Sequence, residues 1–136
     1  MQTPSAGNQQ PWEFYVVEDE SIIQQLATIS PYAGCVVHAK TVIVSVYRKE
    51  IKFPAFAQID LSIAQENMWL ETDALGLGGV WLGVAPIQER MDAVKNILKL
   101  PEEVEAFLVF PVGYPAAFHR QQDRIDLERI HWVDAK

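Results

Sequence analysis

DLSIAQENMWLETDALGLGGVWLG, residues 60–83, combines the longest helical pattern of the chain with a glycine-rich segment directly behind it. The apolar residues of this helix form one broad stripe at helical spacing: Leu61, Ala64, Met68 and Leu75, with Ile63, Leu70 and Ala74 beside them. A stripe of this width predicts a helix that is largely buried rather than one lying on the surface. Asp60 is the expected N-cap, and Gly76 follows the last periodic residue, where a left-handed C-cap favours glycine.

Shorter strand and helix patterns lie on both sides of this helix. β-Branched and aromatic runs predict strands at 13–17, 40–47, about 80–84 and 106–112, and the continuous run at 40–47 is typical of a strand covered on both faces. Helical spacing predicts one helix that is capped by Asp19 or Ser21 and ends before Pro31, and another at 88–98. Residues 116–136 are expected to form an extended arm. This alternation indicates an α/β or α+β class, and propensity alone does not choose between them.

The composition is that of a globular protein, with 49% hydrophobic and 21% charged residues in 136, and a single domain covering 1–136 is expected. A net charge of −7 without a basic cluster disfavours nucleic acid as a partner, and no apolar run is long enough to cross a membrane. The polar start is unlike a signal peptide and Cys35 is the lone cysteine, so a cytoplasmic location is expected. His38, His119 and His131 lack the spacing of zinc ligands, and no metal is expected.

Two glycine-bearing segments are the candidates for ligand binding. The segment GLGGVWLGVAP (76–86) could approach a phosphate through its backbone, although a helix C-cap with close packing explains most of it equally well. Gly83 is the exception, because glycine inside a strand often marks the close approach of a ligand or of another backbone. Near the start, Ser5 and Asn8 could bond a planar heterocycle while Gly7 lets the backbone come near it, or the segment could be a plain turn.

Side chains capable of acid–base or nucleophilic chemistry are not grouped in the sequence. Cys35 is expected in the core, and His38 is expected to be a hydrogen-bonded structural residue. If the chain is an enzyme, a cofactor therefore has to carry the reaction.

Three stretches together resemble the FMN-dependent nitroreductase family: PSAGNQQPWEF (4–14), DLSIAQENMWLETDALGLGGVWLG (60–83) and FPVGYP (110–115). The resemblance implies an α+β fold, a mixed sheet flanked by helices, in an intertwined homodimer with FMN at the interface. It further implies that NAD(P)H passes hydride to flavin N5, and that the flavin then reduces a small-molecule acceptor such as a nitroaromatic or a quinone.

The same resemblance assigns residues to the cofactor. Pro4, Ser5, Ala6 and Asn8 would contact the flavin, and Leu82 and Gly83 would offer backbone N–H groups near N5 and O4. Arg124 would meet the FMN phosphate from the C-terminal segment. No side chain is assigned a catalytic role, because the flavin carries the chemistry.

Family members also carry a helical segment with a basic phosphate-binding motif before the loop at 4–14, and no such segment stands before Met1 here. Three explanations are open: an upstream start, compensation by dimer contacts, or a degenerate relative. We expect FMN binding to persist at reduced affinity. The competing interpretations are a non-catalytic homodimer of the same fold with weak or no flavin binding, and a monomeric flavodoxin-like domain. The second is disfavoured because no phosphate loop follows the first strand.

Overall fold

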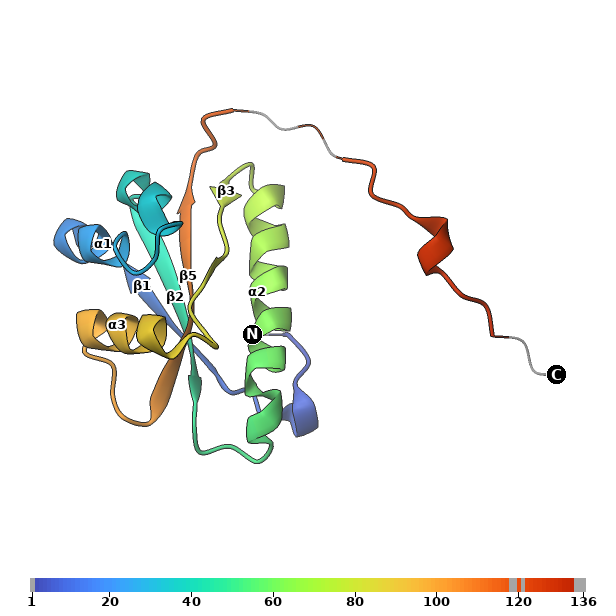
Figure 1. The fold of residues 1–136 in the computed structure, drawn as a ribbon, viewed down its shortest axis with the longest axis horizontal. Helices are drawn as coiled ribbons and strands as arrows, with labels where there is room; N and C mark the ends of the chain where they lie inside the picture. Colours follow the sequence, from blue (N-terminus) through green and yellow to red (C-terminus); the bar gives the residue numbers. More distant parts are fainter. Residues whose placement is uncertain (1, 118–119, 121, 134–136) are drawn as a thin grey trace.

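Five strands form one sheet that separates two layers of helices (Figure 1). The computed structural model describes residues 2–117, 120 and 122–133, so His119 of the sequence analysis lies outside the described residues. The strands are β1 (Trp12–Val17), β2 (Thr41–Arg48), β3 (Gly78–Gly79), β4 (Leu82–Gly83) and β5 (Val104–Gly113). They follow the order β1-β2-β5-β3, and β4 also pairs with β5.

The α+β class is confirmed, but the sheet is simpler than the resemblance implies. Every pairing among the described strands is antiparallel, so the mixed strand directions are not found within this one chain. Strand β5 runs antiparallel to β2 on one side and to β3 and β4 on the other, so β2, β3 and β4 share one direction without being paired to one another.

The helices cover the two faces of the sheet unequally. The helices α1 (Glu20–Leu26) and α3 (Gln88–Leu98) and the 3₁₀ segment η2 (Ala33–His38) lie on one face, and α2 (Ala57–Ala74) lies on the other (Figure 1). Three further 3₁₀ turns are η1 (Ala6–Asn8), η3 (Pro54–Phe56) and η4 (Leu127–Arg129).

Strand β2 is buried on both faces, as its continuous apolar run predicts. Val42, Val44 and Val46 point into the core beneath α1 and α3, whereas Ile43 packs with the core beneath α2. The α2-side core consists of the buried residues Trp12, Leu61, Ala64, Phe107, Leu108 and Phe110. Successive side chains of one strand therefore supply both cores, which is the alternation that a strand requires.

The prediction that α2 is largely buried is wrong for one side of the helix. Leu61 and Ala64 are buried, but Ile59, Ile63 and Leu70 are 54%, 40% and 60% exposed. The apolar stripe is broad because α2 covers the sheet with one side and presents a second apolar side outward. Among the residues that the structure describes, none covers that second side enough to bury these three side chains.

The C-terminal end of α2 follows the predicted capping rule, whereas the start differs from the prediction and its N-cap, Phe56, makes no side-chain capping bond. The helix begins at Ala57, so Asp60 lies inside its first turn and is not the N-cap. At the other end Gly76 has a φ of 72°, and its N–H donates to the Asp73 carbonyl at 2.9 Å. The Leu77 N–H donates to Thr72 at 3.0 Å, which completes a Schellman motif.

The remaining element boundaries agree closely with the sequence patterns. Asp19 is the N-cap of α1, since its carboxylate accepts from the Ile22 N–H at 3.0 Å. Helix α3 has the predicted bounds. The strand expected at 80–84 appears as the separate short pairings β3 and β4 along β5.

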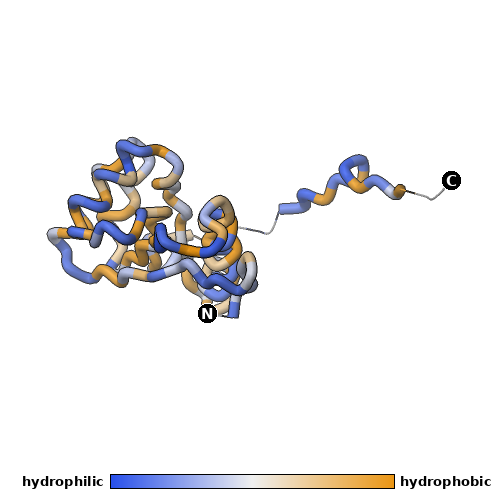
Figure 2. The backbone as a smooth tube through the Cα atoms, turned by 90° about the horizontal axis from the view of Figure 1, so that it is seen from below, coloured by the Kyte–Doolittle hydropathy of each residue, from blue (hydrophilic) through white to orange (hydrophobic). Residues whose placement is uncertain are grey.

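The C-terminal residues leave the globular part as an arm. Residues 120 and 122–133 run away from the sheet apart from the short turn η4, and both views agree on this direction (Figures 1 and 2). Along the arm, hydrophobic and hydrophilic segments alternate (Figure 2). Among the helices that the structure describes, none combines the length and apolar character needed to cross a membrane.

Candidate functional site

The loop at residues 4–10, here called the entrance loop, has an unusual backbone. Gly7, Asn8 and Gln10 all have positive φ angles, of 54°, 55° and 46°. Left-handed conformations are uncommon for residues other than glycine, and they persist where surrounding contacts hold them in place. The loop is therefore a shaped segment and not a plain turn.

Asp60 and Gln9 are the contacts that hold the entrance loop. The Asp60 carboxylate, on a residue only 3% exposed, accepts from the Ala6 N–H at 2.9 Å and from Gln9 Nε2 at 2.7 Å. Gln9 also bonds both backbone groups of Phe53, donating to its carbonyl at 3.1 Å and accepting from its N–H at 2.8 Å. Asp60 thus anchors the loop, a role that sequence reasoning missed by treating it as a helix cap.

Ser5 and Asn8 of the entrance loop retain hydrogen-bond donors that no described residue uses. Ser5 Oγ accepts from the Gln10 N–H at 3.0 Å, which leaves its own hydroxyl hydrogen available. Asn8 Oδ1 accepts from Gln10 Nε2 at 3.2 Å, and the Asn8 side-chain NH₂ donates to no described residue. Pro4 and Asn8 are exposed, while Ser5 and Ala6 are half-buried. The loop can therefore present donors at the surface of one chain.

Gly83 occupies a strand position whose backbone groups face away from β5. The Val80 N–H donates to Pro111 and the Val84 N–H donates to Phe107, at 3.4 and 3.1 Å. Hydrogen-bonded positions alternate along an antiparallel ladder, so the Gly83 N–H points to the open edge. A Cβ added at Gly83 would have no atom within 4 Å, so the space beside it is open.

The same alternation corrects the expectation for Leu82. Its register partner is Val109, and it stands two residues from both Val80 and Val84, so its N–H is directed toward β5. Leu82 is also buried. Of the two N–H groups expected to meet a flavin, only that of Gly83 is directed outward.

Within one chain no hydrogen bond between described residues connects the predicted residues of the loop, of β4 and of the arm with one another. Arg124 lies in the arm, where its guanidinium donates to Gln122 Oε1, and the arm leads away from the sheet (Figure 1). Arg124 is therefore apart from the entrance loop and the Gly83 edge of its own chain.

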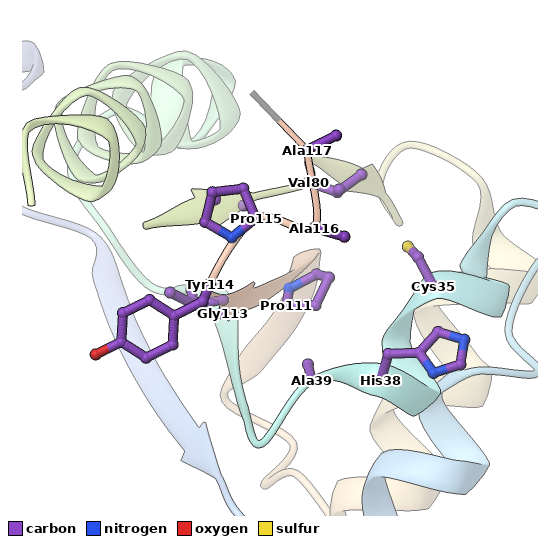
Figure 3. A pocket seen from close by; sticks show the side chains of 13 residues that line it. Cys35, His38, Ala39, Val80, Pro111, Gly113, Tyr114, Pro115, Ala116 and Ala117 are labelled. Atoms are coloured by element: carbon purple, nitrogen blue, oxygen red, sulfur yellow. The ribbon is translucent and has the colours of Figure 1, made fainter. Parts of the chain in front are cut away.

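A cavity of about 410 Å³ lies where the arm leaves β5 (Figure 3). Cys35 and His38 contribute to its wall, and both are exposed, so the expectation that Cys35 belongs to the core is wrong. Ala33 and Val36 are the η2 residues that turn inward. The His38 ring points away from the Cys35 sulfur (Figure 3), so the two do not form a nucleophile–base pair.

The pKa shifts that the structure resolves lie outside these segments. Bonds from the Ser21 hydroxyl and the Ile22 N–H lower the pKa of Asp19, and the hydrogen bond to Glu102 raises the pKa of Lys95. Neither group borders the entrance loop or Gly83. Among the residues that the structure describes, no three His, Cys, Asp or Glu side chains could share a metal ion.

Comparison with known proteins decides the family. Residues 31–114, more than half of the chain, match the model of the nitroreductase family. The chain belongs to the nitroreductase family. A relative from Methanothermobacter thermautotrophicus, named "Putative NADH dehydrogenase/NAD(P)H nitroreductase", is 36% identical over 129 residues, covering 94% of this chain and 68% of the relative.

Solved structures agree with this nitroreductase assignment. A crystal structure of a "Putative NADH Oxidase" from Clostridium acetobutylicum is 43% identical, with a TM-score of 0.92 over 96% of this chain and 80% of that chain. A "putative nitroreductase in complex with fmn" from Desulfovibrio desulfuricans is 26% identical, with a TM-score of 0.79 over 99% and 79% of the two chains.

Proposed function

We propose that this chain is an FMN-dependent oxidoreductase that oxidises NAD(P)H and reduces a nitroaromatic, quinone or related small acceptor. The names of its relatives, including NAD(P)H nitroreductase, and the FMN complex of a nitroreductase of the same fold support this proposal. The observation that carries it is the Gly83 edge, where an outward N–H stands beside open space.

The residues present fit the ring of FMN. The Gly83 N–H would donate to the ring edge, and the missing side chain leaves room for a stacked nicotinamide. Pro4, Ser5, Ala6 and Asn8 of the entrance loop would contact the ring, with the Ser5 hydroxyl and the Asn8 amide as donors. When bound, FMN would supply hydride transfer at its N5 atom. The chain itself orients the ring and keeps the entrance loop in shape through Asp60.

The phosphate of FMN requires a cation, which Arg124 would supply. Its guanidinium is engaged only by the neutral side chain of Gln122 among the described residues, so its charge remains available for an anion. Because the arm that carries Arg124 leads away from the loop of its own chain, we propose that the site is completed by a second copy.

The exposed apolar surface supports a homodimer. Ile59, Ile63 and Leu70 on α2 are at least 40% exposed, and Trp132 and Val133 of the arm are 88% and 95% exposed. Apolar surface of this kind marks an interaction site. An arm lying on the outer side of the partner's α2 would cover both surfaces, and the two-fold symmetry of a dimer would repeat the contact.

A flavin titration tests the proposal. Purified protein mixed with FMN should shift the flavin absorbance bands, and NADH or NADPH added without oxygen should bleach them. The bands should return when a quinone is added. A spectrum that stays that of free FMN, with protein at near-millimolar flavin, would contradict the proposal. Bound flavin that neither nicotinamide bleaches would favour the non-catalytic homodimer instead.

A further inference from the structure

Arg90 of α3 makes a bond to the strand edge proposed to meet the flavin. Its Nη1 donates to the Gly83 carbonyl at 3.0 Å, and the side chain is half-buried. Among the described residues, no carboxylate forms an ion pair with Arg90. The guanidinium is therefore directed at a backbone carbonyl and not at an acidic partner.

The Gly83–Val84 peptide is held from both of its sides. Its carbonyl accepts from Arg90, and its N–H donates to the Phe107 carbonyl at 3.1 Å. Glycine has no side chain to restrict its dihedral angles, and the open space beside Gly83 provides no packing to do so. The bond from Arg90 therefore restrains the Gly83–Val84 peptide from the open edge, and the bond to Phe107 restrains it from the side of β5.

We propose that Arg90 is a positioning residue for the flavin ring, acting by holding the Gly83–Val84 peptide so that the Gly83 N–H keeps its outward direction. This inference rests on the proposed function, because it assigns a role at the same edge. The Gly83 N–H belongs to the preceding Leu82–Gly83 peptide and points to the same edge as the Gly83 carbonyl. The two peptides meet at the φ and ψ angles of Gly83, so loss of the bond from Arg90 would let these angles change and the donor that faces the ring tilt. A donor that is already held in its binding direction loses less conformational entropy on binding than a donor that must first be ordered.

The test compares two flavins and three variants. FMN and riboflavin share the ring, but riboflavin lacks the phosphate, so a ring-positioning residue affects both and a phosphate ligand affects FMN alone. The variants are Arg90→Met, which removes the donor, Arg90→Lys, which keeps a donor, and Lys95→Met as the control. Lys95 lies on the same helix, carries the same charge and pairs with Glu102 at 2.9 Å, away from Gly83.

Arg90→Met should raise the dissociation constants of FMN and riboflavin by a similar factor, about 5- to 30-fold, as expected for the loss of one or two kcal/mol. Arg90→Lys should stay within about threefold of wild type, and Lys95→Met should leave both constants unchanged. In protein without flavin, the Val84 amide should exchange hydrogen faster in Arg90→Met than in Lys95→Met. That measurement detects release of the peptide independently of flavin.

The outcomes separate this inference from the proposed function. Wild type that binds neither flavin overturns the proposed function and, with it, the ring-positioning role. Wild type that binds both while Arg90→Met binds them equally well overturns the Arg90 inference alone. Weakening of FMN without riboflavin overturns it too, because Arg90 would then be a phosphate ligand. Faster exchange of Val84 with an unchanged riboflavin constant also counts against it.

Discussion

The Asp60 carboxylate in α2 accepts the Ala6 N–H at 2.9 Å, joining two residues 54 positions apart in the sequence. A buried carboxylate is stable only when its oxygens are bonded, and here the bonds come from the entrance loop. Helix α2 therefore both covers the sheet and determines the shape of the loop proposed to bind flavin.

Asp60→Asn tests this anchor. The amide can still accept one N–H, but its NH₂ would face the Gln9 Nε2 donor, so one bond is lost and two donors oppose each other. We expect a loss of about 1–3 kcal/mol in the free energy of unfolding by urea, and weaker FMN binding. Asp73→Asn is the control, since Asp73 is exposed on the same helix. Equal stability of the two variants would contradict the anchoring role.

Gly7→Ala tests the loop backbone. Gly7 has a φ of 54°, and an added Cβ would overlap the Phe53 ring, so strain and a clash combine. We expect a destabilisation of about 1–3 kcal/mol in urea unfolding, with lower FMN affinity. Gly34→Ala makes the same change where the space is open and φ is not positive, and it should stay within about 0.5 kcal/mol of wild type.

Gly83→Val should separate binding from stability. A side chain at Gly83 meets no atom within 4 Å, so the free energy of unfolding should change by less than about 1 kcal/mol. The same side chain would occupy the space proposed for the ring and the nicotinamide, so FMN affinity and NADH-dependent bleaching should fall sharply. Gly113→Val, also in open space, is the matched control. Unchanged flavin binding by Gly83→Val would refute this location of the site.

Arg124→Gln should weaken FMN but not riboflavin. A charge-assisted hydrogen bond to the phosphate contributes roughly 1.5–3 kcal/mol, which corresponds to about a 10- to 100-fold change in the dissociation constant. Arg129→Gln serves as the control on the same arm, because Arg129 pairs with Asp126 at 2.8 Å. An equal effect of the two substitutions on FMN would indicate a general charge effect rather than a phosphate contact.

The cap of α1 should depend on pH. Bonds from the Ser21 hydroxyl and the Ile22 N–H lower the pKa of Asp19 below its ordinary value of 3.8. A lowered folded-state pKa means that the stabilisation is present above the unfolded pKa and is lost as the pH falls through the folded pKa. Asp19→Ala should therefore have a lower free energy of unfolding than wild type at pH 7. The difference between the two free energies should become smaller below about pH 4. Asp19→Asn, whose amide does not titrate, should differ less from wild type in free energy of unfolding at pH 7 than Asp19→Ala does.

Local sequence determined most of the elements and several of their ends. The Gly76 cap, the bounds of α3 and the buried run of β2 depend on residues within a few positions of one another, so their patterns are visible in the sequence. The glycine and entrance-loop motifs also indicated the family, because such turns require particular residues wherever the chain folds in this way.

Tertiary structure decided what the patterns left open. Asp60 is a loop anchor and not a cap, and Cys35 is exposed and not in the core, because their surroundings come from segments distant in sequence. The direction of the Gly83 N–H depends on its register with β5, and the link from Arg90 depends on how α3 packs. A hydrophobic period predicts a helix but not which of its sides remains open, since that is decided by packing against the sheet.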